Sequence, residues 1–235
     1  TVQPHFDYPH AYLADLPSKL TATGVGRGYR ADEAAEETPP PRKEVQLRAP
    51  LFEQGEKKLT PAEIGTAHHL FMQFCDFDAA CAPNGVENEL NRLAEKKILS
   101  TEQAHAVDKR KIERFFASDL YKTFMAENKV RREFKFSVLV PAQAYFPVAA
   151  DAPEENVLLQ GVIDCLIETR DGFVILDFKT DRIKKGGAVE RAEQYRPQLA
   201  AYARAVHEIY GRPVRACVLY FFHTGDTEWV SLDED

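Results

Sequence analysis

One stretch of the chain, from Gln160 to Asp181, constrains the fold more than any other. It reads QGVIDCLIETRDGFVILDFKTD, and it predicts two strands of about eight residues joined by a tight hairpin at Arg170-Asp171-Gly172. Two registers are open at this stage. A turn at Arg170-Asp171 places Asp164 opposite Asp177. A turn at Asp171-Gly172 places Asp164 opposite Lys179.

The hairpin gathers charge on one face in either register. Side chains of a strand alternate between its two faces, so Asp164, Asp177 and Lys179 point the same way. The Val, Ile, Leu and Phe residues around them indicate a buried sheet. A buried salt bridge is one explanation, but removing carboxylates from water is costly, and one Lys does not balance two acids. A divalent cation does, because hard cations prefer carboxylate oxygens. We therefore favour a metal site over a structural ion pair.

Composition divides the chain into three parts. We expect residues 1–28 to form an extended or short helical arm and residues 29–58, rich in Ala, Glu and Pro, to form a linker. Residues 59–235 are long enough to bury a substantial core. The chain does not begin with Met, so we expect it to be a piece of a longer protein.

Other features exclude several classes of protein. No apolar run is long enough for a membrane span, and the first residues do not resemble a signal peptide, so we expect no membrane partner and a cytoplasmic location. The four Cys residues form no C-x-x-C pair, which predicts reduced thiols and no iron–sulfur cluster.

Periodicity after residue 59 predicts an α/β fold in which a mixed central sheet is flanked by helices, with an N-terminal helical layer. Thr60-Pro61-Ala62-Glu63 has the pattern of a helix start. A strand that follows a long helix indicates a crossover into the same sheet. The expected helices are 60–75, 86–97, 100–117, 119–127 and 188–210, and the expected strands are 130–140, 157–169, 173–180, 214–223 and 228–232.

The net charge of −7 argues weakly against a nucleic-acid partner, but its distribution does not. The acidic excess lies mainly in residues 31–46 and 233–235, outside the expected core. Basic clusters remain at 109–111, 129–135 and 179–185. A near-neutral body with basic patches is compatible with binding phosphates.

Further polar residues are candidates to complete the site. His68 and His69 point about 100° apart on a helix, so we expect at most one to face the sheet, and a solvent-facing His is the alternative. Glu133, next to Arg132, could support a ligand or hold a water at the metal, or form a strand-end salt bridge.

Three residues of the long helix are candidates as well. Gln198 and Tyr202 share a face and could order a phosphate or the attacking water; Tyr195 precedes them. Packing of the Tyr rings against the sheet is the alternative. Together with the acids and Lys179, these groups suit metal-assisted hydrolysis of a phosphodiester. The chain has no phosphate-binding loop of the ATPase type, so we expect no ATPase activity in it.

Four motifs follow one another in the chain: G-T-x-x-H (65–69), G-x-I-D (161–164), D-x-K-T (177–180) and Q-x-x-x-Y (198–202). Together they resemble the RecB-like branch of the PD-(D/E)XK nucleases. The arginine–glutamate pair Arg132-Glu133 matches a further element of that family. Segments 59–73 and 195–206 resemble, more narrowly, the nuclease domain that ends helicase/nuclease proteins of the AddA type, and the N-terminal YPHAYLADLPSKLTAT resembles the connection from helicase to nuclease.

The resemblance implies a restriction-endonuclease-like core that cuts single strands of DNA. It implies that Mg²⁺ or Mn²⁺ is bound by His69, Asp164 and Asp177, with a backbone carbonyl near Phe178, and that Lys179 is the catalytic lysine. It further implies a bacterial enzyme in which a helicase portion feeds the nuclease, an AddB-type partner completes a heterodimer, and double-strand breaks are processed for recombination. A catalytically silent DNA-guiding or subunit-docking module is the alternative. The expected catalytic residues are Lys179, Asp164, Asp177, Gln198, Tyr202 and Glu133, and the expected DNA-binding residues are Arg132, Arg182 and Tyr195.

Overall fold

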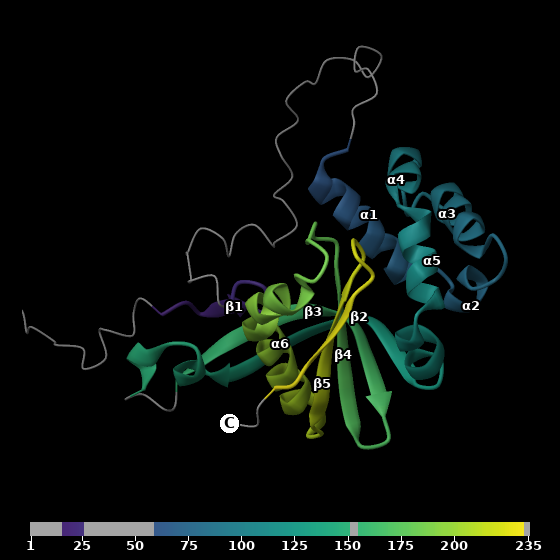
Figure 1. Ribbon diagram of the computed structural model, residues 1–235. Helices are drawn as coiled ribbons and strands as arrows, with labels where there is room; N and C mark the ends of the chain where they lie inside the picture. The colour runs from purple at the N-terminus through teal and green to yellow at the C-terminus, as the bar shows by residue number, and fades with distance from the viewer. Residues whose placement is uncertain (1–15, 26–58, 151–154, 233–235) are drawn as a thin grey trace, which may run out of the picture.

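The computed structural model describes residues 16–25, 59–150 and 155–232 (Figure 1). The predicted linker, 29–58, lies outside the described residues, as does most of the predicted arm. The strands are β1 (Lys19–Thr21), β2 (Lys129–Pro141), β3 (Asn156–Thr169), β4 (Gly172–Lys179), β5 (Val214–Phe221) and β6 (Thr227–Val230). The α-helices are α1 (Pro61–Phe74), α2 (Phe77–Ala80), α3 (Gly85–Glu95), α4 (Thr101–Ala106), α5 (Lys109–Ala117) and α6 (Ala188–Tyr210). A π-helix, η4, spans Leu120–Met125, and two short 3₁₀ helices span Ala142–Ala144 and Pro147–Ala149.

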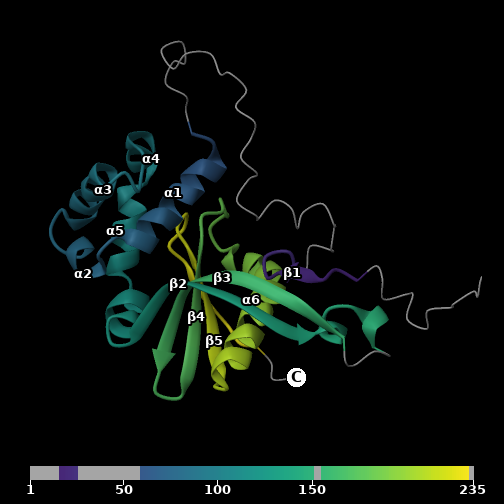
Figure 2. The same cartoon turned by 180° about the vertical axis from the view of Figure 1, so that it is seen from behind.

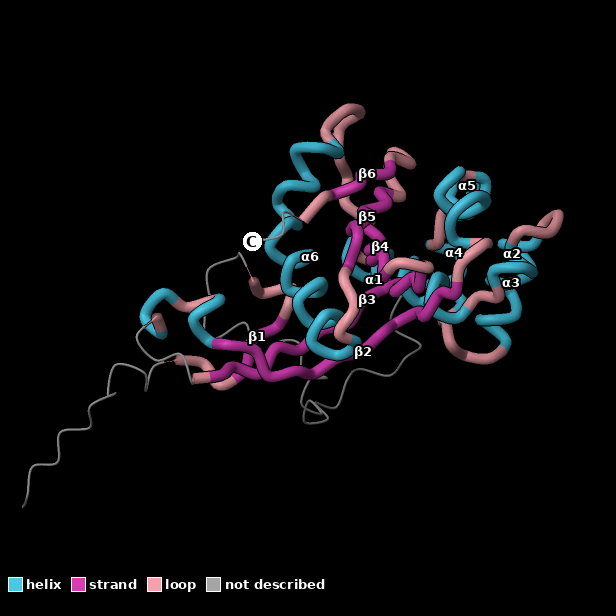
Figure 3. Tube along the Cα trace, turned by 90° about the horizontal axis from the view of Figure 1, so that it is seen from below, coloured by secondary structure: helices cyan, strands magenta, loops and turns pink. Residues whose placement is uncertain are grey.

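The described strands form one mixed sheet in the order β1-β3-β4-β5-β6, and β2 pairs with β3 as well. The β4–β5 pair is parallel, with α6 as the crossover between them, as the sequence predicted. β1 pairs parallel to the first half of β3, so part of the predicted arm adds a strand to this sheet. Figure 3 shows β2 and β3 running side by side as a long ribbon beneath α6.

Two hydrophobic layers cover the sheet, which confirms the predicted α/β class. Helices α1 to α5 and η4 pack on one face, over side chains such as Leu176, Phe178 and Tyr220. Helix α6 packs on the other face, over Ile175, Leu219 and Phe221. Figures 1 and 2 show the helical layer gathered beside one end of the sheet and α6 lying along its opposite face. No helix of the described ranges is long and apolar enough to cross a membrane.

The hairpin adopts the first of the two registers. Thr169 pairs with Gly172, so the turn residues are Arg170 and Asp171. Gly172 is required there, because its φ is 155° and a Cβ atom would stand 2.3 Å from the carbonyl oxygen of Pro213. The same register, continued from the Cys165–Leu176 pair, places Asp164 opposite Asp177.

The helix predicted over 100–117 is wrong in one respect, because it is broken into α4 and α5. Val107 has an extended conformation (ψ 123°), and its side chain is buried in the core beneath the helical layer. The N–H of Asp108 donates to Nε2 of His68 at 3.3 Å, an interaction that a continuous helix would not permit. The short α2 is a further helix that the periodicity did not predict.

Strand β2 changes face at Glu133. Val130 packs on the helical-layer side, whereas Phe134 and Phe136 pack on the α6 side, although all three have even numbers and would share a face in a regular strand. Glu133 lies between them with a φ of 49°, in the left-handed region that non-glycine residues rarely adopt. The pairs flanking it, Arg132–Cys165 and Phe134–Ile163, keep the same register. Glu133 therefore reorients the strand directly across from Asp164.

Candidate active site

The two acids of the hairpin lie where β3 and β4 separate. Ladder pairing between these strands stops at Cys165 and Leu176, one residue short of Asp164 and Asp177. Beyond that point Oδ2 of Asp164 accepts a hydrogen bond of 2.7 Å from the N–H of Phe178, so a side chain replaces the missing ladder bond. Both carboxylates consequently stand in the opening between the two strands.

Helix α1 brings His69 to this opening. Nδ1 of His69 lies 3.2 Å from Oδ1 of Asp164. Burial lowers the pKa of His69, but the hydrogen bond and the charge of Asp164 outweigh burial and leave the pKa raised. His69 is therefore the histidine of the pair that faces the sheet, as the motif spacing predicted.

The neighbouring His68 is a structural residue. It is buried, its Nδ1 contacts the carbonyl oxygen of Ile64 at 2.8 Å, and its Nε2 accepts from the N–H of Asp108. Burial lowers the pKa of His68. The neutral imidazole, with both nitrogens occupied, joins α1 to the start of α5.

Gly65 allows α1 to approach β4 closely enough for His69 to reach Asp164. A Cβ atom at position 65 would lie 2.8 Å from Oγ1 of Thr180, closer than real Cβ contacts. Thr180 directly follows Lys179. The glycine of the G-T-x-x-H motif and the threonine of the D-x-K-T motif are thus in contact, which explains why the two motifs meet in space.

Lys179 is held from three directions. Its Nζ lies 2.7 Å from Oδ2 of Asp177, it donates to Oε1 of Gln198 at 3.2 Å, and it sits 3.7 Å from the centroid of the Tyr195 ring. Nε2 of Gln198 in turn donates to the hydroxyl of Tyr202 at 2.7 Å. The sequence predicted that Gln198 and Tyr202 would order a phosphate or a water. In the structure they orient Lys179, and the predicted contact to a phosphate or water stays a prediction.

Tyr195 is itself fixed by a polar clamp. Its hydroxyl donates to Oδ2 of Asp181, and Nε of Arg191 donates to the same oxygen at 3.0 Å. Burial raises the pKa of Asp181, but the hydrogen bonds from Tyr195 and Arg191 outweigh burial and leave that pKa lowered. The clamp sets the angle of the ring beneath the ammonium of Lys179. Sequence spacing alone could not reveal this contact, because it joins a strand end to a helix through a loop.

Glu133 approaches the same carboxylates from β2. Burial raises the pKa of Glu133, and the negative charge of Asp164 raises it further. The residue is half-buried and lies in the left-handed conformation described above. Backbone strain of this kind persists where the surrounding structure fixes it, and it is common at functional sites. The contact of its carboxyl group to a metal ligand or a water stays a prediction.

The donor set fits a divalent cation. Asp177 is 4% exposed, and burial raises its pKa, against the lowering effect of the charge of Lys179. Its Oδ2 is buried and lies 2.7 Å from Nζ of Lys179. Two carboxylates and an imidazole are ligands that Mg²⁺ and Mn²⁺ accept. Within the described ranges, however, no three His, Cys, Asp or Glu side chains already form a ligand cluster. Instead, His69 contacts Oδ1 of Asp164 and Lys179 contacts Oδ2 of Asp177.

The predicted DNA-binding residues lie in three different settings. Tyr195 supports Lys179, as described. Nη1 of Arg132 donates to the carbonyl oxygens of Met72 and Cys75 at 3.1 and 2.5 Å, so this guanidinium caps the C-terminal end of α1. Arg182 is exposed beyond the end of β4. The DNA contacts of all three stay predictions.

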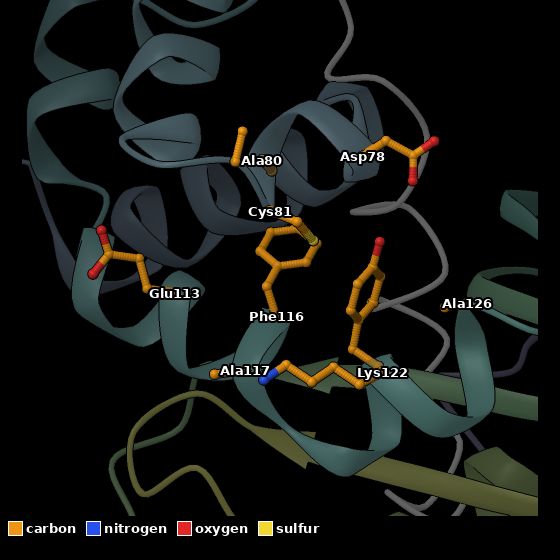
Figure 4. A pocket seen from close by; sticks show the side chains of 10 residues that line it. Asp78, Ala80, Cys81, Glu113, Phe116, Ala117, Lys122 and Ala126 are labelled. Carbon is orange, nitrogen blue, oxygen red and sulfur yellow. The ribbon is translucent and has the colours of Figure 1, made fainter.

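A hollow elsewhere in the molecule does not share these groups. It has a volume of about 600 Å³ and lies between α2, α5 and η4, lined by side chains that include Cys81, Phe116 and Lys122 (Figure 4). Glu113 and Lys122 provide opposite charges at its edges. None of the predicted site residues lines it, so the convergent chemistry lies where β3 and β4 stop pairing and not in this hollow.

Comparison with protein families agrees with this geometry. The family model described as "PD-(D/E)XK nuclease superfamily" matches residues 42–231. The chain belongs to this superfamily. This membership confirms the resemblance that the sequence motifs indicated, and it supports a nuclease role. Nucleases of this superfamily generally use divalent metals. The assignment of Asp164, Asp177 and Lys179 to the D…D-x-K elements of this superfamily stays a prediction.

Three curated relatives of this PD-(D/E)XK nuclease are named as A-type subunits of an ATP-dependent helicase/nuclease. The protein from Moorella thermoacetica is 40% identical over 93% of the chain, and that from Desulforamulus reducens is 38% identical over 94%. The protein from Desulforudis audaxviator is 36% identical over 94%. The chain spans only 15% to 18% of the length of these relatives.

Proposed function

We propose that this chain is a metal-dependent deoxyribonuclease domain that hydrolyses phosphodiester bonds of single-stranded DNA. In this proposal the strand is delivered by a helicase motor in a longer bacterial, cytoplasmic protein of the AddA type, which works with an AddB-type partner in processing double-strand breaks for recombinational repair. Membership of the nuclease superfamily and the names of the relatives support it.

One observation carries the proposal. His69, Asp164, Asp177 and Lys179 come from a helix and two strands, yet they form a connected set of contacts at the point where the strands separate. Two largely buried carboxylates meet one ammonium there, and such an excess of negative charge is costly unless a further cation balances it. The silent-module alternative predicts loss of the D-x-K signature, which is intact here.

The residues divide into ligands and supports. His69, Asp164 and Asp177 would hold Mg²⁺ or Mn²⁺, and Asp164 is oriented for this by the N–H of Phe178. When bound, a divalent cation supplies a Lewis acid that polarises a phosphoryl oxygen and makes a nearby water more acidic.

Lys179 contributes positive charge to the reaction. Hydrolysis forms a bond between a water oxygen and phosphorus and breaks one P–O ester bond, while the water loses a proton and the departing oxygen gains one. Negative charge grows on the phosphoryl oxygens during this exchange. The ammonium of Lys179 is fixed by Asp177, Gln198 and Tyr195 before the substrate arrives, so it can stabilise that charge without reorganisation.

The test is cleavage of a labelled single-stranded oligonucleotide with Mg²⁺, under single-turnover conditions with the chain in excess so that weak DNA binding does not hide activity. Asp177→Ala and Lys179→Ala should each abolish cutting while the circular dichroism spectrum is unchanged. Asp171→Ala, at the exposed turn of the same hairpin, is the matched control and should cut normally. Full activity in either of the first two variants, or no cutting by the unaltered chain, would overturn the proposal.

A further inference from the structure

A second hollow, of about 400 Å³, lies directly beside the candidate active site. One wall is formed by residues of α1, including Ile64, Gly65 and His68, immediately before His69. The other wall is formed by Thr180, Asp181 and Arg182, immediately after Lys179. Both walls are thus continuous with the segments that carry the proposed ligands and the lysine. A DNA strand that brings a phosphate to Lys179 therefore passes next to this hollow.

The hollow has a net positive lining. Lys111 enters from α5 and Arg182 from the segment after β4. Arg182 is exposed. Lys111 contacts Asp108 at 3.7 Å, at the limit of an ion pair. Asp181, the acid of the lining, is already paired with Arg191 and Tyr195.

The remaining lining is apolar or internally satisfied. Pro61, Ala62 and Ile64 present aliphatic surface from the first turns of α1. His68 has both ring nitrogens occupied, and Phe222, whose ring centroid lies 5.7 Å from that of His68, also lines the hollow. A cavity lined by aliphatic side chains and two cations suits a sugar or base attached to a phosphate. Its volume lies within the range of about 300–1,000 Å³ found for small-ligand sites.

We propose that this hollow is a nucleotide subsite, which receives the nucleotide adjacent to the cleaved bond, with Arg182 and Lys111 binding its phosphate. The proposal rests on the proposed nuclease function and deepens it by assigning a path to the DNA strand.

The first test measures the affinity of the chain for a fluorescent oligothymidylate as a function of salt, with chelator present so that the DNA is not cut. Each phosphate contact to single-stranded DNA contributes about 0.7 to the slope of log Kd against log salt concentration. Arg182→Ala and Lys111→Ala should each lower that slope by about 0.7 and weaken binding whatever the base sequence. Arg170→Ala removes one exposed charge at the far hairpin turn and serves as the matched control.

A second variant tests the cavity itself without changing charge. Ala62→Trp places an indole in the hollow, whereas Ala144→Trp places one on an exposed position that does not line it. We expect Ala62→Trp to raise KM for cleavage several-fold, with the loss in KM and not in kcat, and Ala144→Trp to have no effect.

The outcomes separate the two proposals. The subsite is overturned, and the nuclease function stands, if the unaltered chain cleaves normally and three variants behave like their controls. These variants are Arg182→Ala, Lys111→Ala and Ala62→Trp. Absence of both binding and cleavage in the unaltered chain would overturn both. Equal weakening by Arg182→Ala and Arg170→Ala would show diffuse electrostatic attraction and would also overturn the subsite.

Discussion

The ammonium of Lys179 shows how this site is organised at the scale of single residues. An isolated lysine samples many rotamers, and fixing it costs conformational entropy. Here an acid, an amide and an aromatic face hold it in one place, and a second set of contacts holds the aromatic ring. Preorganisation of this kind is worth more in a buried site than in water.

Substitution of Tyr195 tests this support. Tyr195→Leu removes the ring beneath Lys179, and a cation–π contact contributes about 0.5–2 kcal/mol. We expect kcat to fall by roughly twofold to thirtyfold. Tyr195→Phe keeps the ring and loses only the hydroxyl bonded to Asp181, so its activity should lie between that of Leu and that of the unaltered chain. Cleavage rates at saturating DNA measure this order, and equal rates for Leu and Phe would contradict it.

The charged residues of the site could be predicted from the sequence because side chains of a regular strand alternate between its two faces. This rule placed Asp164, Asp177 and Lys179 near one another, and in the structure Lys179 pairs with Asp177 while Asp164 accepts from the N–H of Phe178, between them. The left-handed conformation of Glu133 and the ring of Tyr195 beneath Lys179 could not be predicted in this way. Both depend on tertiary packing that leaves no periodic signal in the chain.

At the scale of elements, the decisive contact is that of α1 against β4. The helix begins with a capping box, in which Thr60 and Glu63 bond each other's backbone N–H groups, and it ends with carbonyls bonded by Arg132 and Arg92. Both ends are therefore fixed. The helix cannot slide to relieve a clash at Gly65 without moving His69.

A double substitution tests this contact. Gly65→Ala places a methyl group 2.8 Å from Oγ1 of Thr180, and overpacking of this kind typically costs about 1–3 kcal/mol. We expect cleavage and thermal stability both to fall. Adding Thr180→Ala removes the clashing oxygen and leaves Cβ atoms at 3.7 Å, an ordinary contact. Recovery in the double variant, measured by melting temperature and rate, supports the account. A double variant no better than Gly65→Ala would contradict it.

The junction of α2 and α3 carries a pH-dependent contribution to stability. Glu89 is buried, accepts the N–H of Asp76 at 2.6 Å and pairs with Arg92. The hydrogen bond from Arg92 lowers the pKa of Glu89 below its ordinary value of 4.5. A lowered native pKa stabilises the fold fully above the unfolded value and loses this effect as pH falls through the native pKa.

Glu89→Gln should therefore cost about 1–3 kcal/mol in the free energy of unfolding at neutral pH. The difference from the unaltered chain should shrink as the pH is lowered below 4.5, measured by urea denaturation at several pH values. Exposed Glu87→Gln, on the same helix, is the control. A difference that is constant across this range would contradict the assignment.

The whole molecule places the site where its two layers meet at one end of the sheet. The helical layer supplies His69, the sheet supplies the acids and Lys179, and α6 supplies the residues that orient Lys179. The sequence predicted these layers and the crossover through α6, because long amphipathic helices and apolar strands have clear periods. The sequence did not predict the break between α4 and α5. This break depends on the hydrogen bond that the N–H of Asp108 donates to His68 on α1, a helix distant in the sequence.

The central claim is that His69, Asp164 and Asp177 bind one shared cation, and a Mn²⁺ titration of the chain tests it without any dependence on DNA affinity. The account predicts a single ion whose dissociation constant rises by more than about tenfold in Asp164→Asn, Asp177→Asn and His69→Ala, and is unchanged in the exposed control Asp171→Asn. Binding that is equally tight in Asp164→Asn or Asp177→Asn would contradict the claim.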